Sequence, residues 1–356
     1  MKRNRNICLF VCLFVCLCLF ISVLIWFVVC YPMTKLKNIE IVNVKTPNAD
    51  IYKDDCLHPC IRFYKDSFLG YKYWMVQSPY FAKNNQIENP ILYRSNDMLN
   101  WDNGIEVEST PQSGYNSDPC IYREDSLLYI FWRECYTPFC TQNNAKRMTV
   151  GVSTKDGKIF SDKKIYLVEQ EEEIDREQCP ILVKEGNDYW FYCAWYEYIP
   201  ERKSRGVAIW KGTSLEEPNF VLEDTVLVES PVLRDRWIST KLFGYRVFVP
   251  KFIAYDLWHF DLYKHNDTLF MVSCSEGSDN IMLYHSLDGK DWVVNNTPLI
   301  NNHALENTVG YRQTYYKPTI FVENDTTHLF FTSQDMKDSK RNILWHASFM
   351  DLNMIE

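Results

Sequence analysis

Ionisable side chains recur at one position of a repeated pattern in this chain. They open five strand-like segments: His58 in LHPC, Asp118 in SDPC, Glu177 and Gln178 in EQCP, His259 and Asp261 in WHFD, and Tyr316 and Lys317 in YYKP. Gathered in one place, such groups would put carboxyl groups capable of proton transfer beside imidazole and ammonium groups. The chemistry therefore depends on whether the fold brings segments together that lie some sixty residues apart.

The five segments share one layout. Each opens with Pro, or with Phe260 in the fourth case, then alternates apolar and polar residues, passes a polar turn and re-enters an aromatic run, which predicts two antiparallel strands joined by a hairpin. The opening positions 59, 119, 180, 260 and 318 are 60, 61, 80 and 58 residues apart, enough for four strands per unit. Repetition at this period predicts an all-β, five-bladed β-propeller over residues 51–356, with a β-sandwich as the main competitor.

A second motif ends several of the units: YRSNDMLNW, GVSTKDGKIF and YHSLDGKDW. Ser followed by an Asp-rich turn and an aromatic residue predicts a strand that enters a tight turn, with the aromatic residue packed between blades. The run IEIVNVKT, residues 39–46, is expected to supply a strand that closes the last blade. The insertion that lengthens the third interval, roughly residues 230–256, is expected to form a loop at the mouth.

The inner strands of a propeller line a central funnel, so the five openings would converge there. Two carboxyl groups facing each other across roughly 5 to 9.5 Å are the arrangement that cleaves a glycosidic bond. Asp118, Glu177 and Asp261 are the candidates for catalysis. Glu88, in IENP, is a further acidic residue near the funnel, which we group with the substrate-binding residues and keep as an alternative base.

The layout resembles the five-bladed glycoside hydrolases of the arabinanase, xylosidase and fructosidase type, from about Cys56 to the C-terminus. This resemblance implies that Asp118, in an Asp-Pro that opens a blade, positions the general acid and adjusts its pKa, and that Glu177 is that acid. Glu177 stands three residues before Pro180, whereas the family has two. The family has an Asp that acts as the base in its first blade, whereas this chain has His58 at that position. Such enzymes sometimes hold calcium or sodium in the funnel, but no ligand set here requires one, and we predict no cofactor.

Substrate binding is assigned to the remaining funnel and aromatic residues: His58, Glu88, Arg133, Trp195, Trp258, His259, Tyr316 and Lys317. Trp195 and Trp258 are expected to stack on sugar rings, although most aromatic residues of a propeller pack between blades. The positive charge at His58, Arg133, His259 and Lys317 would suit an anionic sugar, a phosphate-bearing glycan or phosphorolysis.

The N-terminus predicts a membrane anchor. Residues 7–30 contain no charged side chain, are long enough to span a bilayer, and follow Lys2, Arg3 and Arg5. We expect residues 1–6 to be a cytoplasmic tail, 7–30 an uncleaved single-pass helix, and 31–50 a stalk. The propeller would then lie at the cell surface, in the periplasm or in the secretory lumen. A cleaved signal peptide is the alternative, and it leaves the compartment unchanged.

Composition narrows the partners further. The net charge is −8 and no segment concentrates basic residues, which argues against nucleic acid. Of the 13 cysteines, five lie in residues 7–30 and eight beyond, so disulfides are permitted; Cys56 with Cys60 and Cys135 with Cys140 are near enough to close small loops. No cluster at zinc spacing appears, so no metal site is predicted. Sequons at Asn266, Asn295 and Asn324 would be glycosylated only in a eukaryotic secretory pathway.

These observations predict a membrane-tethered enzyme that hydrolyses or transfers a glycosidic bond of a carbohydrate or glycoconjugate. The absence of an Asp at position 58 and the displaced Glu177 favour one alternative, a lectin-like propeller that binds glycan without cleaving it. A purely structural ectodomain would instead have a featureless funnel, contrary to the polar openings.

Overall fold

The structure is a computed structural model of the whole chain, and it describes most of the residues beyond position 55. The described residues are 14, 16–17, 19–20, 22, 40–44, 55–136, 146–168, 178–199, 202–228, 236–242, 245–251, 257–274, 280–295, 298–301, 304–305, 314–334 and 341–350. Most of the predicted anchor at 7–30 lies outside them, as do Glu177 and Cys140. Among the described residues, no helix is long and apolar enough to cross a membrane.

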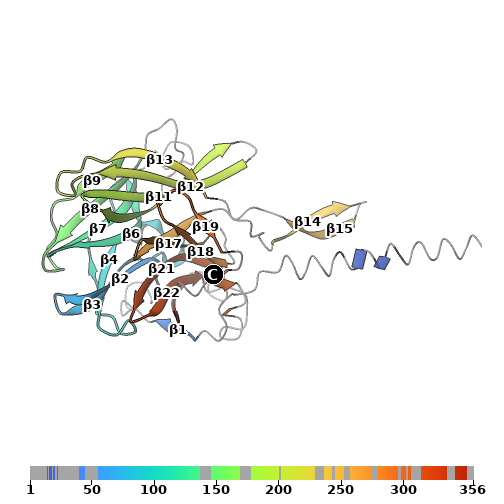
Figure 1. Cartoon of the computed structure of the whole chain (residues 1–356), viewed down its shortest axis with the longest axis horizontal. Coiled ribbons are helices and arrows are strands. Elements are labelled where there is room, and N and C mark those ends of the chain that lie inside the picture. The colour runs from blue at the N-terminus through green and yellow to red at the C-terminus, as the bar shows by residue number, and fades with distance from the viewer. Residues whose placement is uncertain are drawn as a thin grey trace, which may run out of the picture.

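Five antiparallel sheets form the blades of a β-propeller (Figure 1). Blade 1 contains β2 (Leu57–Phe68), β3 (Tyr71–Ser78), β4 (Ile91–Ser95) and β5 (Ile105–Glu106). Blade 2 contains β6 (Gly114–Glu124), β7 (Leu127–Tyr136), β8 (Lys146–Thr154) and β9 (Lys164–Val168). Blade 3 contains β10 (Gln178–Glu185), β11 (Asp188–Ile199), β12 (Arg202–Gly212) and β13 (Val221–Leu227). The predicted five-unit repeat is thus confirmed, and each predicted hairpin supplies the first two strands of a blade.

The other two blades complete the ring. Blade 4 contains β16 (His259–His265), β17 (Thr268–Cys274), β18 (Asn280–Ser286) and β19 (Val293–Val294), with β20 (Ile300–Asn301) paired to β18. Blade 5 contains β21 (Tyr315–Glu323), β22 (Thr326–Gln334) and β23 (Asn342–Met350). Its fourth strand comes from the N-terminal side: β1 (Ile41–Val44) pairs antiparallel with β23, as expected for the closing strand. This pairing joins both ends of the propeller in one sheet.

The insertion between blades 3 and 4 differs from the predicted loop. It contains a hairpin of β14 (Arg236–Leu242) and β15 (Tyr245–Lys251), which form a two-stranded sheet of their own (Figure 1). The segments RWISTKL and YRVFVPK are rich in β-branched and aromatic residues, which favour strands.

Aromatic residues on the second strands hold adjacent blades together. Phe131 of β7 and Phe191 of β11 pack edge to face, with ring centroids 5.0 Å apart, and both are fully buried. Burying a side chain of this size stabilises the fold by about 1.5–3 kcal/mol. The turn motif also crosses blades: a Cβ on Gly289, whose φ is +73°, would lie 2.3 Å from the Tyr192 hydroxyl oxygen of the preceding blade. Glycine is therefore required at that turn by backbone and by space.

The inner strands carry a repeated irregularity where they meet the funnel. The pairing register shifts across residues 57–60, 117–120, 178–181 and 316–319, each at the Pro of the repeat. His58, Asp118 and Cys179, each directly before that Pro, have left-handed backbones with φ of 47°, 53° and 55°. Such bulges redirect side chains next to functional sites, and a left-handed residue other than glycine costs about 1–3 kcal/mol. The repeat thus places its opening residues toward the axis.

Candidate active site

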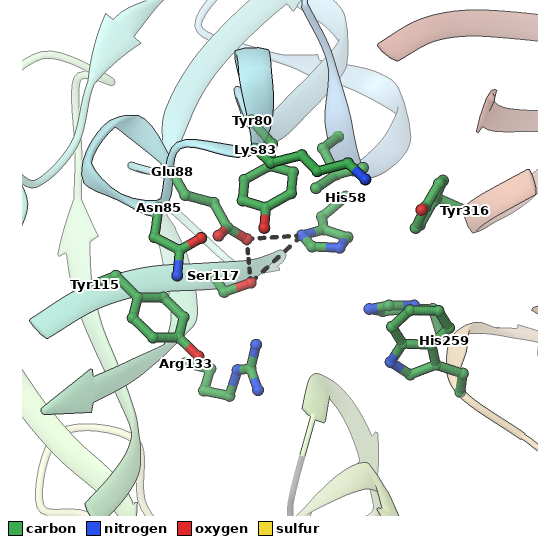
Figure 2. A pocket seen from close by; sticks show the side chains of 12 residues that line it. His58, Tyr80, Lys83, Asn85, Glu88, Tyr115, Ser117, Arg133, His259 and Tyr316 are labelled. Carbon is green, nitrogen blue, oxygen red and sulfur yellow. Dashed lines mark hydrogen bonds and ion pairs between the residues drawn. The ribbon is translucent and has the colours of Figure 1, made fainter. Parts of the chain in front are cut away.

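A pocket of about 270 Å³ lies over the ends of the inner strands. Its walls come from blades 1, 2, 4 and 5 and from the segment between β3 and β4, and they comprise Leu57, His58, Tyr80, Lys83, Asn85, Glu88, Tyr115, Ser117, Arg133, Trp258, His259 and Tyr316. Figure 2 shows Glu88, Ser117 and His58 linked on one side, with His259 and Tyr316 across the opening. Polar groups thus converge between aromatic walls, an arrangement common in small-molecule sites.

Asp118 is the centre of the polar network beneath this pocket. Its side chain is fully buried, with Oδ1 3.5 Å from His58 Nδ1 and 3.2 Å from His259 Nε2. Its Oδ2 forms an ion pair with Arg133 Nη2 at 3.0 Å, and the Cys179 thiol donates to Oδ1 at 3.4 Å. Residues of blades 1, 3 and 4, together with Arg133 on the second strand of the same blade as Asp118, therefore hold one carboxylate in place.

Glu88 supplies the carboxyl group that faces the cavity. It ends the short 3₁₀ segment η2 (Asn85–Ile87), accepts a hydrogen bond from the Ser117 hydroxyl, and lies 3.2 Å from His58 Nδ1. Burial raises the pKa of Glu88 to about 8, although the hydrogen bond from Ser117 opposes this. Glu88 is therefore protonated near pH 7 and can donate a proton inside the pocket.

The charges at the base of the pocket are distributed unevenly. Burial lowers the pKa of both His58 and His259 to about 4, so both imidazoles are neutral near pH 7. Burial also opposes ionisation of Asp118, but His58, Arg133 and His259 together hold its pKa well below the ordinary value. With the imidazoles neutral, the Arg133 guanidinium balances Asp118 through an ion pair, and the buried Lys317 ammonium also acts on this carboxylate.

Six of the eight residues predicted to bind substrate line the pocket: His58, Glu88, Arg133, Trp258, His259 and Tyr316. The Trp258 ring lies beside both His259 and Tyr316, with centroids 4.6 Å and 6.0 Å away. Asp118, predicted to be catalytic, lies directly beneath them. These residues meet because equivalent positions of different blades face one axis, as the repeat predicts.

Three predicted residues lie elsewhere. Asp261 is fully buried, and both of its oxygens accept hydrogen bonds from Arg62, which favours a structural role over the predicted catalytic one. Lys317 is fully buried and donates to the Pro119 carbonyl at 2.8 Å, so it supports the base of the pocket and does not line it. Trp195 packs in the apolar cluster between blades 2 and 3, which favours blade packing over sugar stacking. Glu177 lies outside the described residues.

Sequence reasoning missed five polar or aromatic residues of the pocket wall: Tyr80, Lys83, Asn85, Tyr115 and Ser117. Tyr115 and Ser117 precede Asp118 on the same inner strand, and their period-two spacing could have identified them. Tyr80, Lys83 and Asn85 lie between β3 and β4 in a segment with no counterpart in the repeat. Ala82 and Lys83 there have left-handed backbones, with φ of 57° and 59°.

His58, Asp118 and His259, which we call the central triad, also form a potential metal-binding group. Their ligand atoms all lie within 4.8 Å of one another, although sequence spacing indicated no metal site. The reason for the difference is that the three residues come from blades 1, 2 and 4, whereas zinc motifs are recognised by ligands close in sequence.

Neither known family models nor curated proteins match this chain, but solved structures do. An N-acetylgalactosamine deacetylase from F. plautii, in complex with blood group B trisaccharide, matches with a TM-score of 0.64 and 13% identity, over 90% of this chain and 97% of the other. An α-L-arabinofuranosidase from Lactobacillus brevis matches with a TM-score of 0.56 and 12% identity, over 83% of this chain and 90% of the other. A GH32 β-fructofuranosidase from Bombyx mori matches with a TM-score of 0.57 and 10% identity, over 86% of this chain and 61% of the other. The expected resemblance to five-bladed glycoside hydrolases is thus confirmed at the level of the fold.

Proposed function

We propose that this chain is a carbohydrate-active hydrolase, and that Glu88 is the group that transfers protons to the bond being cleaved. The observation that carries this proposal is the position of Glu88: its carboxyl group faces the pocket, in contact with His58 and Ser117, among aromatic residues suited to sugar rings. Arg133, which lines the pocket, would bind substrate hydroxyl or acyl oxygens. The structural neighbours that act on carbohydrate support this substrate class.

Two kinds of bond are candidates. Cleavage of a glycosidic bond needs a second carboxylate across the cavity, and Asp118 is enclosed behind the two imidazoles and Arg133. Among the described residues, Glu88 is the one carboxyl group in the pocket wall. The glycosidic reaction therefore requires Glu177 or another residue beyond those described.

Removal of an acyl substituent from a sugar is the second candidate, and the pocket chemistry favours it. That reaction needs an acid–base group beside donors that stabilise a developing oxyanion, and it does not need two opposed carboxylates. Glu88, as the acid–base group, and Arg133, as the donor, meet this description. The deacetylase from F. plautii is a fold neighbour with this type of activity.

The experiment compares wild type with Glu88→Gln on N-acetylated and unsubstituted oligosaccharides, measuring acetate release and new reducing ends separately. We expect Glu88→Gln to lower turnover by at least about a hundredfold, with unchanged circular dichroism and melting temperature. Glu217→Gln, a change at an exposed carboxylate, is the matched control. Wild-type turnover in Glu88→Gln would refute the assignment. Glycan binding with no product from the wild type would identify a lectin-like protein.

We also propose that residues 7–30 tether the propeller to a membrane, with the propeller outside the cytoplasm. The support is the uncharged run and the basic residues before it. The full chain should stay in the membrane pellet after alkaline carbonate extraction, and a chain that begins at residue 31 should not. Release of the full chain would contradict the tether.

A further inference from the structure

The central triad is built from rigid and buried parts. The residues His58, Asp118 and His259 are 6%, 0% and 3% exposed. His58 and His259 lie at the start of the inner strands β2 and β16, and Asp118 lies within the inner strand β6. Left-handed backbones at His58 and Asp118 hold two of the three toward the axis. The rings of His58 and His259 lie against each other, with centroids 4.7 Å apart, and each places a nitrogen within 3.5 Å of Asp118 Oδ1. A site that must hold an ion in fixed geometry needs ligands fixed in this way.

The triad contains a buried polar atom that the protein does not satisfy. His259 Nδ1 is buried and has no hydrogen-bond partner among the described residues. Arg133 pairs with Asp118 Oδ2, whereas Oδ1 lies near both imidazoles and also accepts a hydrogen bond from the Cys179 thiol. Both imidazoles also line the pocket, so any group held between them and Oδ1 would be open to the cavity on one side.

The donor types select a class of ion. Two imidazole nitrogens with one carboxylate oxygen suit first-row divalent metals such as zinc, manganese or iron, whereas calcium and magnesium prefer ligand sets made of oxygen. Three protein ligands with open positions toward a pocket are typical of catalytic sites, whereas structural zinc sites have four.

We propose that His58, Asp118 and His259 together bind one divalent transition-metal ion at the base of the pocket, with its open positions toward Glu88 and the substrate. When bound, such an ion polarises a carbonyl oxygen as a Lewis acid. That catalytic meaning rests on the proposed function, but the binding of the ion does not.

The test measures metal binding directly, without substrate. The purified full chain is stripped with EDTA, dialysed against Zn²⁺ or Mn²⁺, and analysed for bound metal; Co²⁺ is added separately to follow its visible absorption. We expect one equivalent per chain and a Co²⁺ spectrum typical of nitrogen and oxygen ligands. His259→Gln and Asp118→Asn should weaken binding by more than the roughly 10–100-fold effect of losing an outer-shell partner. His265→Ala, a histidine of the same blade that lies outside the triad, should bind as wild type does.

Melting temperatures distinguish loss of the metal site from loss of the fold. Metal should raise the melting temperature of the stripped wild type and leave that of His259→Gln unchanged. A wild-type chain that binds no stoichiometric metal, or variants that bind as tightly as wild type, would overturn the site. Stoichiometric binding without hydrolysis would leave the site standing and refute the proposed function. Full hydrolysis by a stripped, metal-free chain would leave the proposed function standing and refute the catalytic role of the ion.

Discussion

Arg62 of blade 1 and Asp261 of blade 4 form a two-pronged ion pair inside the propeller, with both nitrogen–oxygen distances at 2.7 Å. Thr319 of blade 5 donates its hydroxyl to the same carboxylate. Asp261 is fully buried and the Arg62 side chain is 16% exposed. This cluster joins three blades that are far apart in sequence, and it is the polar counterpart of the aromatic packing between neighbouring blades.

Removing one partner of this pair should destabilise the protein more than removing both. Asp261→Ala leaves the Arg62 charge buried without its partner, for which we expect a loss of about 3–5 kcal/mol in the free energy of unfolding. The double change Arg62→Met with Asp261→Leu should cost less, because no charge is left unpaired. Urea unfolding of both variants measures the difference. A stable Asp261→Ala protein with turnover alone reduced would instead support the catalytic role predicted from sequence.

Asp261 also shows where prediction from sequence succeeded and where it could not. Alternation along β16 places His259 and Asp261 on the same face, so both were expected to face the axis, and both do. Depth along the axis decides their roles: His259 reaches the pocket, while Asp261 meets Arg62 below it. Depth depends on how blades are staggered against one another, which a repeat read along one chain does not specify.

Lys83, which was not predicted, illustrates the second limit. The repeat predicts residues of the inner strands, and Asp118, His58 and His259 follow from it. Glu88 and Lys83 come from the segment between β3 and β4, whose backbone is set by local contacts such as the Lys83 amide donating to the Tyr80 carbonyl at 2.9 Å. Trp195 lies away from the pocket for another reason: its strand turns this side chain toward blade 2, because residues 191, 193 and 195 share that face.

Lys83 should determine preference for anionic substrates. Arg133 is balanced by Asp118, and Lys317 is buried below the pocket, whereas Lys83 lines the pocket with no ion pair found among the described residues. On the proposed function, Lys83→Gln should raise the KM for a substrate with a carboxylate or sulfate by about tenfold, or about 1.4 kcal/mol. The KM for the neutral analogue should not change. Lys72→Gln is the control at another exposed lysine, and equal effects of Lys83→Gln on both substrates would contradict the prediction.

Cys60 and Cys120 should be cross-linked when the protein folds in an oxidising compartment. Their sulfur atoms lie 3.6 Å apart at equivalent positions of blades 1 and 2, although both thiols are free here, and the small-loop pairing of Cys56 with Cys60 is not formed. Oxidised glutathione would accept two electrons and two protons from the thiols as the sulfur–sulfur bond forms, giving two reduced molecules. Because both residues are buried, the reaction belongs to folding and not to the finished protein.

The cross-link is measured by alkylating the unfolded protein with and without prior reduction and mapping the peptides. Expression in an oxidising compartment should give a peptide that joins Cys60 to Cys120. Cys60→Ser should then lower the free energy of unfolding by about 2–4 kcal/mol. Cys193→Ser should leave the cross-link in place. Alkylation of both thiols before reduction would show that no bond forms.

His328 and His346 should make the last blade sensitive to acid. His328 Nδ1 and His346 Nε2 are 3.0 Å apart, and the His346 ring stacks on Phe330 at 4.4 Å. Burial, together with His328, lowers the pKa of His346 from 6.5 to about 4. The folded state therefore binds fewer protons than the unfolded state between these values, so stability rises with pH across this window and is lost as pH falls.

The expected effect of His346 is up to about 3 kcal/mol, at about 1.4 kcal/mol per pKa unit. Urea unfolding between pH 4 and pH 7 measures it as the difference in slope between wild type and His346→Phe, which keeps the ring stacked on Phe330 but cannot take a proton. His346→Phe should lose less stability than wild type on acidification. His265→Phe, at a less buried histidine, should follow the wild-type slope. Parallel curves for wild type and His346→Phe would show that this pair does not couple protonation to the closure of the propeller, where β1 meets β23.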